Sequence, residues 1–169
     1  ALFFEFGTGW HLGMALAFHC LGAPRQVVTD VRRLVRPELV REMVTALSRV
    51  TSGIPGRARP PVSLRGEPSN GDFESRVNEQ YGIEYRAPCS PSRTGLPAGS
   101  VDCITSTFTL EHVPPAEIPP LLRECRRLLR PDGVASFLID YQDHYSYTDT
   151  KLSRYHFLRF PDRVWHFVN

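Results

Sequence analysis

Short apolar segments alternate with amphipathic ones along most of this chain, and this alternation limits the folds that the chain can adopt. Short apolar runs closed by turn residues are typical of buried strands, and apolar residues three or four apart are typical of helices. The expected strands are residues 2–6, 25–31, 83–87, 101–110 and 134–140, and the expected helices are residues 11–22, 37–50, 73–80 and a segment that begins near Pro119 and Pro120. Strands that alternate with helices form a mostly parallel sheet with right-handed connections. The sequence therefore predicts a doubly wound α/β fold.

The length and charge of the chain restrict its organisation and its partners. Its 169 residues suffice for a hydrophobic core, and we expect one domain over residues 1–169. The net charge of +2 produces no strong field that would attract nucleic acid. No apolar run reaches the roughly 18 residues that cross a membrane. We therefore expect neither a nucleic-acid partner nor a membrane span.

The four cysteines lack the spacing of a zinc site or of a redox motif. They are Cys20, Cys89, Cys103 and Cys125. We expect buried or idle thiols in a reducing compartment, and hence a cytoplasmic protein without a metal site.

Three segments are expected to lie outside the regular elements. Residues 51–72 are rich in glycine, proline and serine, and predict a long loop or an insertion. Residues 131–133, "PDG", predict a turn, and residues 141–169 form an aromatic-rich tail in which residues 151–160 are a possible helix. The chain starts inside an apolar run without Met, so we expect a fragment.

Two glycines follow the first expected strand, in the stretch "FFEFGTGW". In a doubly wound sheet, ligands bind beyond the carboxyl ends of the strands, and glycines there let a ligand approach the backbone. A dinucleotide motif would have a third glycine at position 12, where this chain has Leu12. Glu5, two residues before Gly7, would repel a phosphate. This loop therefore favours a ligand with a positive end, such as an amine or a sulfonium, over a dinucleotide.

Asp30 ends the second expected strand, 21 residues beyond Gly9. A carboxylate in this place can accept hydrogen bonds from both hydroxyls of a ribose. The alternative is a helix cap or a solvated loop acid. Because Asp30 follows a glycine loop at this spacing, we favour the ribose interpretation.

Four stretches together resemble the class I S-adenosylmethionine-dependent methyltransferases, of the type 11 kind. They are "FFEFGTG", "VVTDV", "LPAGSVDCITSTFTLEHV" and "LLRECRRLLRPDGVASFLID". The resemblance covers residues 2–140 except for residues 51–72. It implies a Rossmann-like, mostly parallel sheet and S-adenosyl-L-methionine as the cofactor, with methyl transfer to a small-molecule acceptor.

The resemblance also implies roles for individual residues. Glu5 would hold the amino end of the methionine moiety, Asp30 would hold the ribose hydroxyls, and Ser106 and Thr107 would lie beside the methionine. The full predicted cofactor-binding set is Glu5, Gly7, Thr8, Gly9, Trp10, Asp30, Val31, Ser106 and Thr107. The Trp10 ring is expected either to cover the methionine end or to pack against the first helix, and we favour packing.

The chain departs from the family pattern in two respects. Many members place an acid after the third strand to meet the adenine amino group, but residues 87–90 read "APCS", so we expect a backbone or hydroxyl contact there. The family sheet normally ends in a sixth and a seventh strand, and a helix normally covers the cofactor from the N-terminal side. We expect this chain to lack that cap and to be truncated after its fifth strand.

The tail at residues 141–169 is expected on the substrate side of the site. Asp140, Asp143, His144 and Tyr145 cluster there, and His144 with Asp140 could take a proton from the attacking atom of the acceptor. A metal site, since Asp and His are ligands, and a polar loop with aromatic packing are the alternatives. Methyl transfer often needs only alignment of the nucleophile, without a base.

Three other acidic or basic residues flank the fourth expected strand. Asp102 is predicted to be structural, because it lies at the start of that strand and away from the pocket end. Glu111 and His112 suit either the pocket or a capping role.

Two other functions stay open at this point. A nicotinamide-dependent oxidoreductase would place an acid similarly to Asp30, although Glu5 and the lost third glycine argue against it. A non-catalytic nucleoside-binding module of the same fold would bind the cofactor without turnover.

Overall fold

The computed structural model describes residues 1–51, 58–64 and 72–168. The chain forms two compact units, residues 1–138 and residues 139–169. The regular sheet lies entirely within the first unit.

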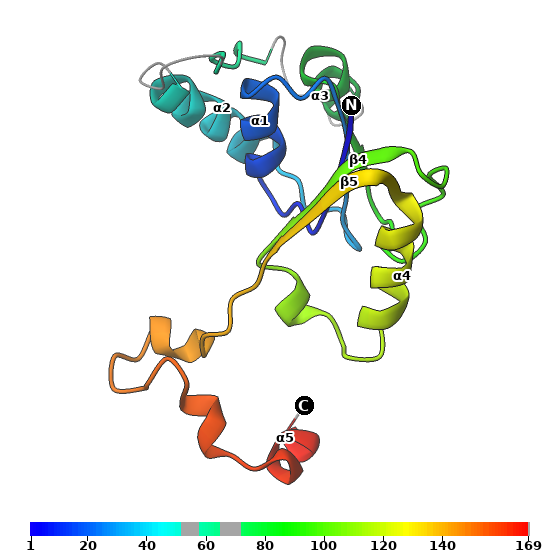
Figure 1. The fold of residues 1–169 in the computed structure, drawn as a ribbon. Coiled ribbons are helices and arrows are strands. Elements are labelled where there is room, and N and C mark those ends of the chain that lie inside the picture. The colour runs from blue at the N-terminus through cyan, green and yellow to red at the C-terminus, as the bar shows by residue number, and fades with distance from the viewer. Residues whose placement is uncertain (52–57, 65–71, 169) are drawn as a thin grey trace. The chain divides into compact units, whose positions relative to one another are not determined.

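Five parallel strands form one sheet in the order β3-β2-β1-β4-β5 (Figure 1). The strands are β1 (Leu2–Phe6), β2 (Arg25–Thr29), β3 (Ile83–Arg86), β4 (Val101–Thr107) and β5 (Leu129–Leu138). β1 lies in the centre, with β2 on one side and β4 on the other. The predicted α/β fold with a doubly wound, parallel sheet is therefore confirmed.

Helices cover both faces of this sheet, as the sequence pattern predicts (Figure 1). They are α1 (Gly13–Cys20), α2 (Pro37–Thr51), α3 (Phe73–Tyr81) and α4 (Ile118–Leu128), with a short 3-10 helix η1 (Leu110–His112) after β4. Alternate side chains of β1 point to opposite faces. The Phe3 ring lies 5.3 Å from that of Phe18 in α1, whereas the Phe6 ring lies 5.7 Å from that of Phe137 in β5.

The main core fills the face that α1, α2 and α3 cover. It contains Leu12, Ala15, Leu16, Val28, Val40, Val44, Leu64, Phe73, Val77, Tyr81, Ile83, Tyr85 and Ala87. Of the apolar residues at helical spacing in α2, Val40 and Val44 are buried. Met43 and Leu47 are partly buried against this core, whereas Val50 is exposed. The loops after β1 and β2 lead into α1 and α2, which pack on this face.

The prediction of a turn at residues 131–133 between α4 and the fifth strand is wrong, because these residues lie inside the strand. The structure has one strand over Leu129–Leu138, and the strand ends at residue 138 rather than 140. Val101 pairs with Leu129 and Cys103 pairs with Val134, so β5 advances five positions while β4 advances two. The extra residues bulge out of the ladder. Gly133 fits there because a Cβ would lie 3.1 Å from the carbonyl oxygen of Val101.

Other boundaries also shift by a few residues. α1 begins at Gly13 rather than at residue 11, and β4 ends at Thr107 rather than at residue 110. The predicted loop at residues 51–72 falls partly outside the described residues. Its described part, residues 58–64, contains neither helix nor strand.

The second unit, residues 139–169, contains short helices only, within its described part. They are η2 (His144–Tyr147), η3 (His156–Arg159) and α5 (Asp162–Val168). Of the predicted helix at residues 151–160, only a 3-10 turn over His156–Arg159 forms. A backbone hydrogen bond of 2.6 Å from the Asp143 N–H to the Arg154 carbonyl closes the segment between η2 and η3.

None of the helices in the described part of the chain combines the length and apolar character that a bilayer crossing requires.

Candidate functional site

The strand order places a crevice at the carboxyl ends of the central strands. Chain connections leave β1 toward β2 and return through β4 on the other side, and ligands of open α/β sheets bind at this reversal. A cavity of about 180 Å³ lies here. It is lined by residues that follow β1, β2, β3 and β4 and by α4: Phe6, Gly7, Thr29, Asp30, Val31, Ser90, Pro91, Ser92, Thr109, His112, Val113, Pro114, Glu117 and Leu121.

The glycine loop after β1 adopts the backbone that its sequence requires. Gly7 and Gly9 have φ angles of 71° and 68°, which favour glycine strongly. The Gly7 N–H donates to the Thr29 carbonyl at 2.9 Å, which ties the loop to β2. A Cβ on Gly9 would meet no atom within 4 Å. The loop is therefore open at Gly9, where a ligand can approach the main chain.

Leu12 occupies the position of the missing third glycine and keeps a glycine-like backbone. Its φ angle is 53°, in the left-handed region that non-glycine residues rarely adopt. The Leu12 side chain is fully buried in the core. The chain thus keeps the left-handed turn before α1 but fills the position with an apolar anchor.

The carboxylate of Asp30 is bonded to the glycine loop. Its Oδ2 accepts the Gly9 N–H at 3.3 Å, and its Oδ1 accepts the Arg32 N–H at 3.4 Å. The Asp30 backbone is fixed too, because its carbonyl accepts the Cys89 N–H at 2.8 Å. Asp30 is buried yet lines the cavity. Its carboxylate therefore lies beside both the glycine loop and the cavity.

Glu5 is buried beneath the loop without full pairing. Within the described residues, Glu5 Oε2 and Thr8 Oγ1 are buried and have no hydrogen-bond partner. Burial raises the pKa of the Glu5 carboxyl to about 7. Unpaired buried acceptors are costly, so a ligand that donates hydrogen bonds or brings a positive charge would stabilise both groups.

Comparison with known proteins was informative for the middle of the chain. A family model described as "Methyltransferase domain" matches residues 74–137, from α3 through most of β5. This finding supports a class I S-adenosylmethionine-dependent methyltransferase. The family finding also supports S-adenosylmethionine as the cofactor.

Among solved structures, the chain is similar to phosphoethanolamine N-methyltransferase 1 of Haemonchus contortus, solved in complex with phosphoethanolamine and S-adenosylhomocysteine. The sequence identity is 14% and the TM-score is 0.49. The match covers 82% of this chain and 22% of that one, so this chain spans about a fifth of that protein's length. No match among curated proteins was found.

The residues around the glycine loop fit S-adenosylmethionine on one structural test. A Glu5 carboxyl oxygen before the glycine loop and the Thr8 hydroxyl within it are buried without a partner among the described residues. The sulfonium and ammonium groups of S-adenosylmethionine are cationic and would suit this site. A dinucleotide pyrophosphate would bring negative charge to the same loop. The donor and acceptor set therefore suits a cationic nucleoside better than a dinucleotide.

The structure distributes the predicted cofactor-binding residues unevenly around the cavity. Gly7, Asp30 and Val31 line it. The other members of the predicted set, which are Glu5, Thr8, Gly9, Trp10, Ser106 and Thr107, lie in or beside the loops but not in the cavity lining. The Ser106 hydroxyl donates to the Phe6 carbonyl at 3.1 Å, so it joins β4 to β1.

Trp10 makes a contact that the sequence did not predict. Its ring is half exposed, and the guanidinium carbon of Arg36 lies 5.3 Å from the ring centroid. The Arg36 N–H also donates to the Trp10 carbonyl at 2.9 Å. This cation–π pair holds the loop against the start of α2.

Several residues that line the cavity were not predicted from the sequence. Ser90 and Ser92 follow β3 with their hydroxyl oxygens 2.9 Å apart, at the place where the family's acid is absent. Thr109 and Glu117 also line the cavity. The sequence indicated only Ser90 indirectly, because the missing acid at residues 87–90 led us to expect a backbone or hydroxyl contact there. Nothing in the spacing of Thr109 or Glu117 singled them out.

Asp102 has the structural role that its position predicts. Its carboxylate accepts the Leu2 N–H at 2.6 Å and the Arg130 guanidinium at 2.9 Å. The Leu2 bond, followed by the charge of Arg130, outweighs desolvation and lowers the pKa of the Asp102 carboxyl. These bonds join the starts of β1, β4 and β5, at the sheet edge opposite to the cavity.

The predicted catalytic residues, His144 and Asp140, both lie in the second unit. Asp140 Oδ2 accepts the Tyr147 hydroxyl and lies 3.6 Å from His144 Nε2, while Oδ1 accepts the Gln142 N–H at 2.9 Å. The Tyr147 hydrogen bond is the main reason why the pKa of Asp140 is lowered. An ionised Asp140 beside His144 is the arrangement that orients an imidazole.

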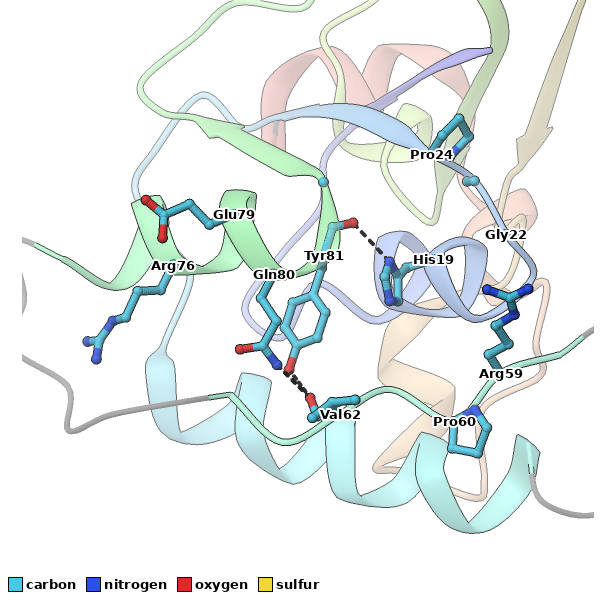
Figure 2. A pocket seen from close by; sticks show the side chains of 12 residues that line it. His19, Gly22, Pro24, Arg59, Pro60, Val62, Arg76, Glu79, Gln80 and Tyr81 are labelled. Carbon is cyan, nitrogen blue, oxygen red and sulfur yellow. Dashed lines mark hydrogen bonds between the residues drawn. The ribbon is translucent and has the colours of Figure 1, made fainter.

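A larger cavity of about 900 Å³ opens at the opposite edge of the sheet (Figure 2). Figure 2 shows His19 directed at the backbone of Tyr81, and its Nδ1 lies 2.9 Å from the Tyr81 carbonyl oxygen. The Tyr81 hydroxyl donates to the Val62 carbonyl at 2.6 Å. This cavity borders Pro24 and Gly82, which precede β2 and β3. It is therefore remote from the carboxyl ends of the strands, where ligands of this fold bind.

Proposed function

We propose that this chain binds S-adenosylmethionine at the carboxyl edge of its sheet and transfers the methyl group to a small-molecule acceptor. The observation that carries the proposal is the bond between Asp30 and the glycine loop, beside a cavity at the strand reversal. An acid and a glycine loop joined in this way suit a ribose placed over open backbone.

Asp30 would accept hydrogen bonds from the ribose hydroxyls, and Glu5 would pair with the amino end of the methionine moiety. Gly7, Thr8 and Gly9 would line the moiety through the backbone of their loop. Val31 would lie against the ribose or the base, because it lines the cavity and its side chain is largely exposed. The remaining proposed contacts come from Trp10, Ser106 and Thr107.

When bound, the cofactor supplies an electrophilic methyl group on a sulfonium. The chain would contribute alignment of the acceptor and exclusion of water. His144 would accept the proton that the acceptor loses, and Asp140 would orient its ring, in keeping with the 3.6 Å separation of the pair. These catalytic roles, like the small-molecule acceptor, are part of the proposal.

Calorimetry with S-adenosylhomocysteine and with NADH tests the cofactor. We expect binding of S-adenosylhomocysteine and none of NADH, because Glu5 disfavours a pyrophosphate. The opposite result would establish the oxidoreductase alternative in place of this proposal.

A methyl-transfer screen with radiolabelled cofactor over small amines, hydroxyls and acids tests the activity. We expect label in at least one acceptor. Cofactor binding without any transfer would favour the non-catalytic nucleoside-binding module.

A cytoplasmic location also stays a prediction, in keeping with the four free thiols.

A further inference from the structure

The chain turns sharply after β4, directly beside the glycine loop. Phe108 has a φ angle of 53°, which is unusual for a bulky residue and costs free energy. Its N–H donates to the Leu138 carbonyl at 2.8 Å, so the pairing of β4 with β5 continues to this residue. The next residue, Thr109, is thereby directed back toward β1.

The side chain of Thr109 fills the space that a side chain on Gly7 would need. A Cβ placed on Gly7 would lie 2.1 Å from Thr109 Oγ1 and 2.4 Å from Cγ2. The Thr109 hydroxyl has two acceptors within reach, the Thr107 carbonyl at 3.2 Å and the Gly7 carbonyl at 3.4 Å. A single hydroxyl hydrogen shared over such lengths is a weak tie. Close packing is therefore the main contact between Thr109 and Gly7.

Gly7 is held on its other side by β2. Its N–H donates to Thr29 at 2.9 Å, so Thr109 and Thr29 enclose it from the two strands that flank β1. Gly7, Thr29 and Thr109 all line the cavity that also contains Asp30. A shift of Thr109 would free Gly7 to leave its left-handed conformation and would move the loop relative to Asp30.

We propose that Thr109 is a positioning residue, which sets cofactor affinity by holding Gly7 in the conformation that opens the loop to the ligand. The inference rests on the proposed function. It assigns the effect to the shape of the side chain and not to its hydroxyl group.

The test is calorimetric titration of the full chain with S-adenosylhomocysteine for wild type, Thr109→Ala, Thr109→Val and Thr109→Ser. Removing the packing lets the loop move, so Thr109→Ala should weaken binding about tenfold, the cost of ordering one loop or side chain. Thr109→Val keeps the shape and should bind within about twofold of wild type. Thr109→Ser keeps the hydroxyl but lacks Cγ2, and should fall between Ala and Val.

Thr45→Ala is the matched control, because Thr45 is an exposed threonine of α2 whose hydroxyl donates to the Arg41 carbonyl in the same helix. Its affinity should equal that of wild type. Circular dichroism and thermal unfolding check that each variant is folded. If Thr109→Ala does not fold, the order of Val above Ser decides the question.

The outcomes separate this inference from the proposed function. Wild-type binding with equal affinity for Thr109→Ala would overturn the positioning role alone. A large loss in Thr109→Val with retention in Thr109→Ser would also overturn it, because the hydroxyl would then be responsible. No binding by wild type would overturn both proposals.

Discussion

The N–H of Gly9 and the carboxylate of Asp30 are joined by a hydrogen bond of 3.3 Å, across 21 residues of sequence. The bond connects the loop after β1 to the end of β2, the two segments that the sequence marks for the methionine and ribose parts of the cofactor. Asp30 therefore has two tasks in the proposed site. It shapes the loop, and it offers its remaining acceptor capacity to a ligand.

Substitution of Asp30 should separate these two tasks. Asp30→Ala removes every acceptor and should weaken S-adenosylhomocysteine binding by about 1–3 kcal/mol. Asp30→Asn keeps one side-chain oxygen for the Gly9 N–H and should lose less. Calorimetry measures both affinities.

Asp102→Asn serves as the control for Asp30, because Asp102 is bonded at the opposite edge of the sheet. It should lower the thermal midpoint without changing cofactor affinity. Unchanged affinity in Asp30→Ala would remove the ribose assignment.

Leu12 is buried and has a left-handed backbone, so we expect a glycine variant at this position to be more stable than an alanine variant. Truncating a buried leucine costs about 2–5 kcal/mol, whereas relief of left-handed strain by glycine returns about 1–2 kcal/mol. Urea unfolding should therefore rank wild type above Leu12→Gly, and Leu12→Gly above Leu12→Ala. If Leu12→Ala is the more stable of the two variants, position 12 is not strained.

Glu5 should make the stability of the ligand-free chain depend on pH. The unfolded chain loses the Glu5 proton near the ordinary pKa of 4.5, but the folded chain keeps it until about pH 7. The unfolded state thus gains stability relative to the folded state as pH rises through this window, by about 3 kcal/mol in all. Glu5→Gln removes the titration, so its stability relative to wild type should increase between pH 4.5 and 7.

Urea unfolding across this pH range measures the effect of Glu5, with Glu124→Gln as its control. The pKa of Glu124 is lowered to about 2, chiefly by its hydrogen bond to Arg127 and despite some desolvation. Its carboxyl is ionised in both states over most of the window, so the difference between Glu124→Gln and wild type should stay nearly constant. A constant difference for Glu5→Gln as well would show that Glu5 titrates normally.

His144→Ala should reduce turnover while cofactor affinity stays the same. General-base catalysis contributes about 10²–10⁴-fold, and a loss in that range of kcat is expected once an acceptor is known. His156→Ala is the control, because His156 lies in the same unit and its ring packs edge-on against Phe160. Equal turnover of His144→Ala and wild type would show that His144 is not the general base and belongs to a polar loop without a catalytic role.

The elements that sequence predicts well are those with strong periodicity or clear stops. β1 has the predicted bounds, and α2 begins at Pro37 as predicted. The predicted start of β5 was wrong, because the length of this strand depends on its pairing with β4. Residues 131–133 look like a turn locally, yet pairing with β4 continues through them as a bulge. A local pattern contains no information on the length of the partner strand.

For the site, the sequence by itself determined which residue types meet the ligand edge. The glycines and Asp30 follow apolar strands, and Glu5 is the next-to-last residue of one. In a parallel sheet all strand ends of one kind share an edge. Tertiary structure alone decided how these groups are held. The left-handed backbone of Leu12, the packing of Thr109 on Gly7 and the unpaired Glu5 oxygen all depend on contacts between segments far apart in the chain. Such contacts arise only when neighbouring strands bring their following loops within a few ångströms of each other, and no spacing along the sequence specifies that distance.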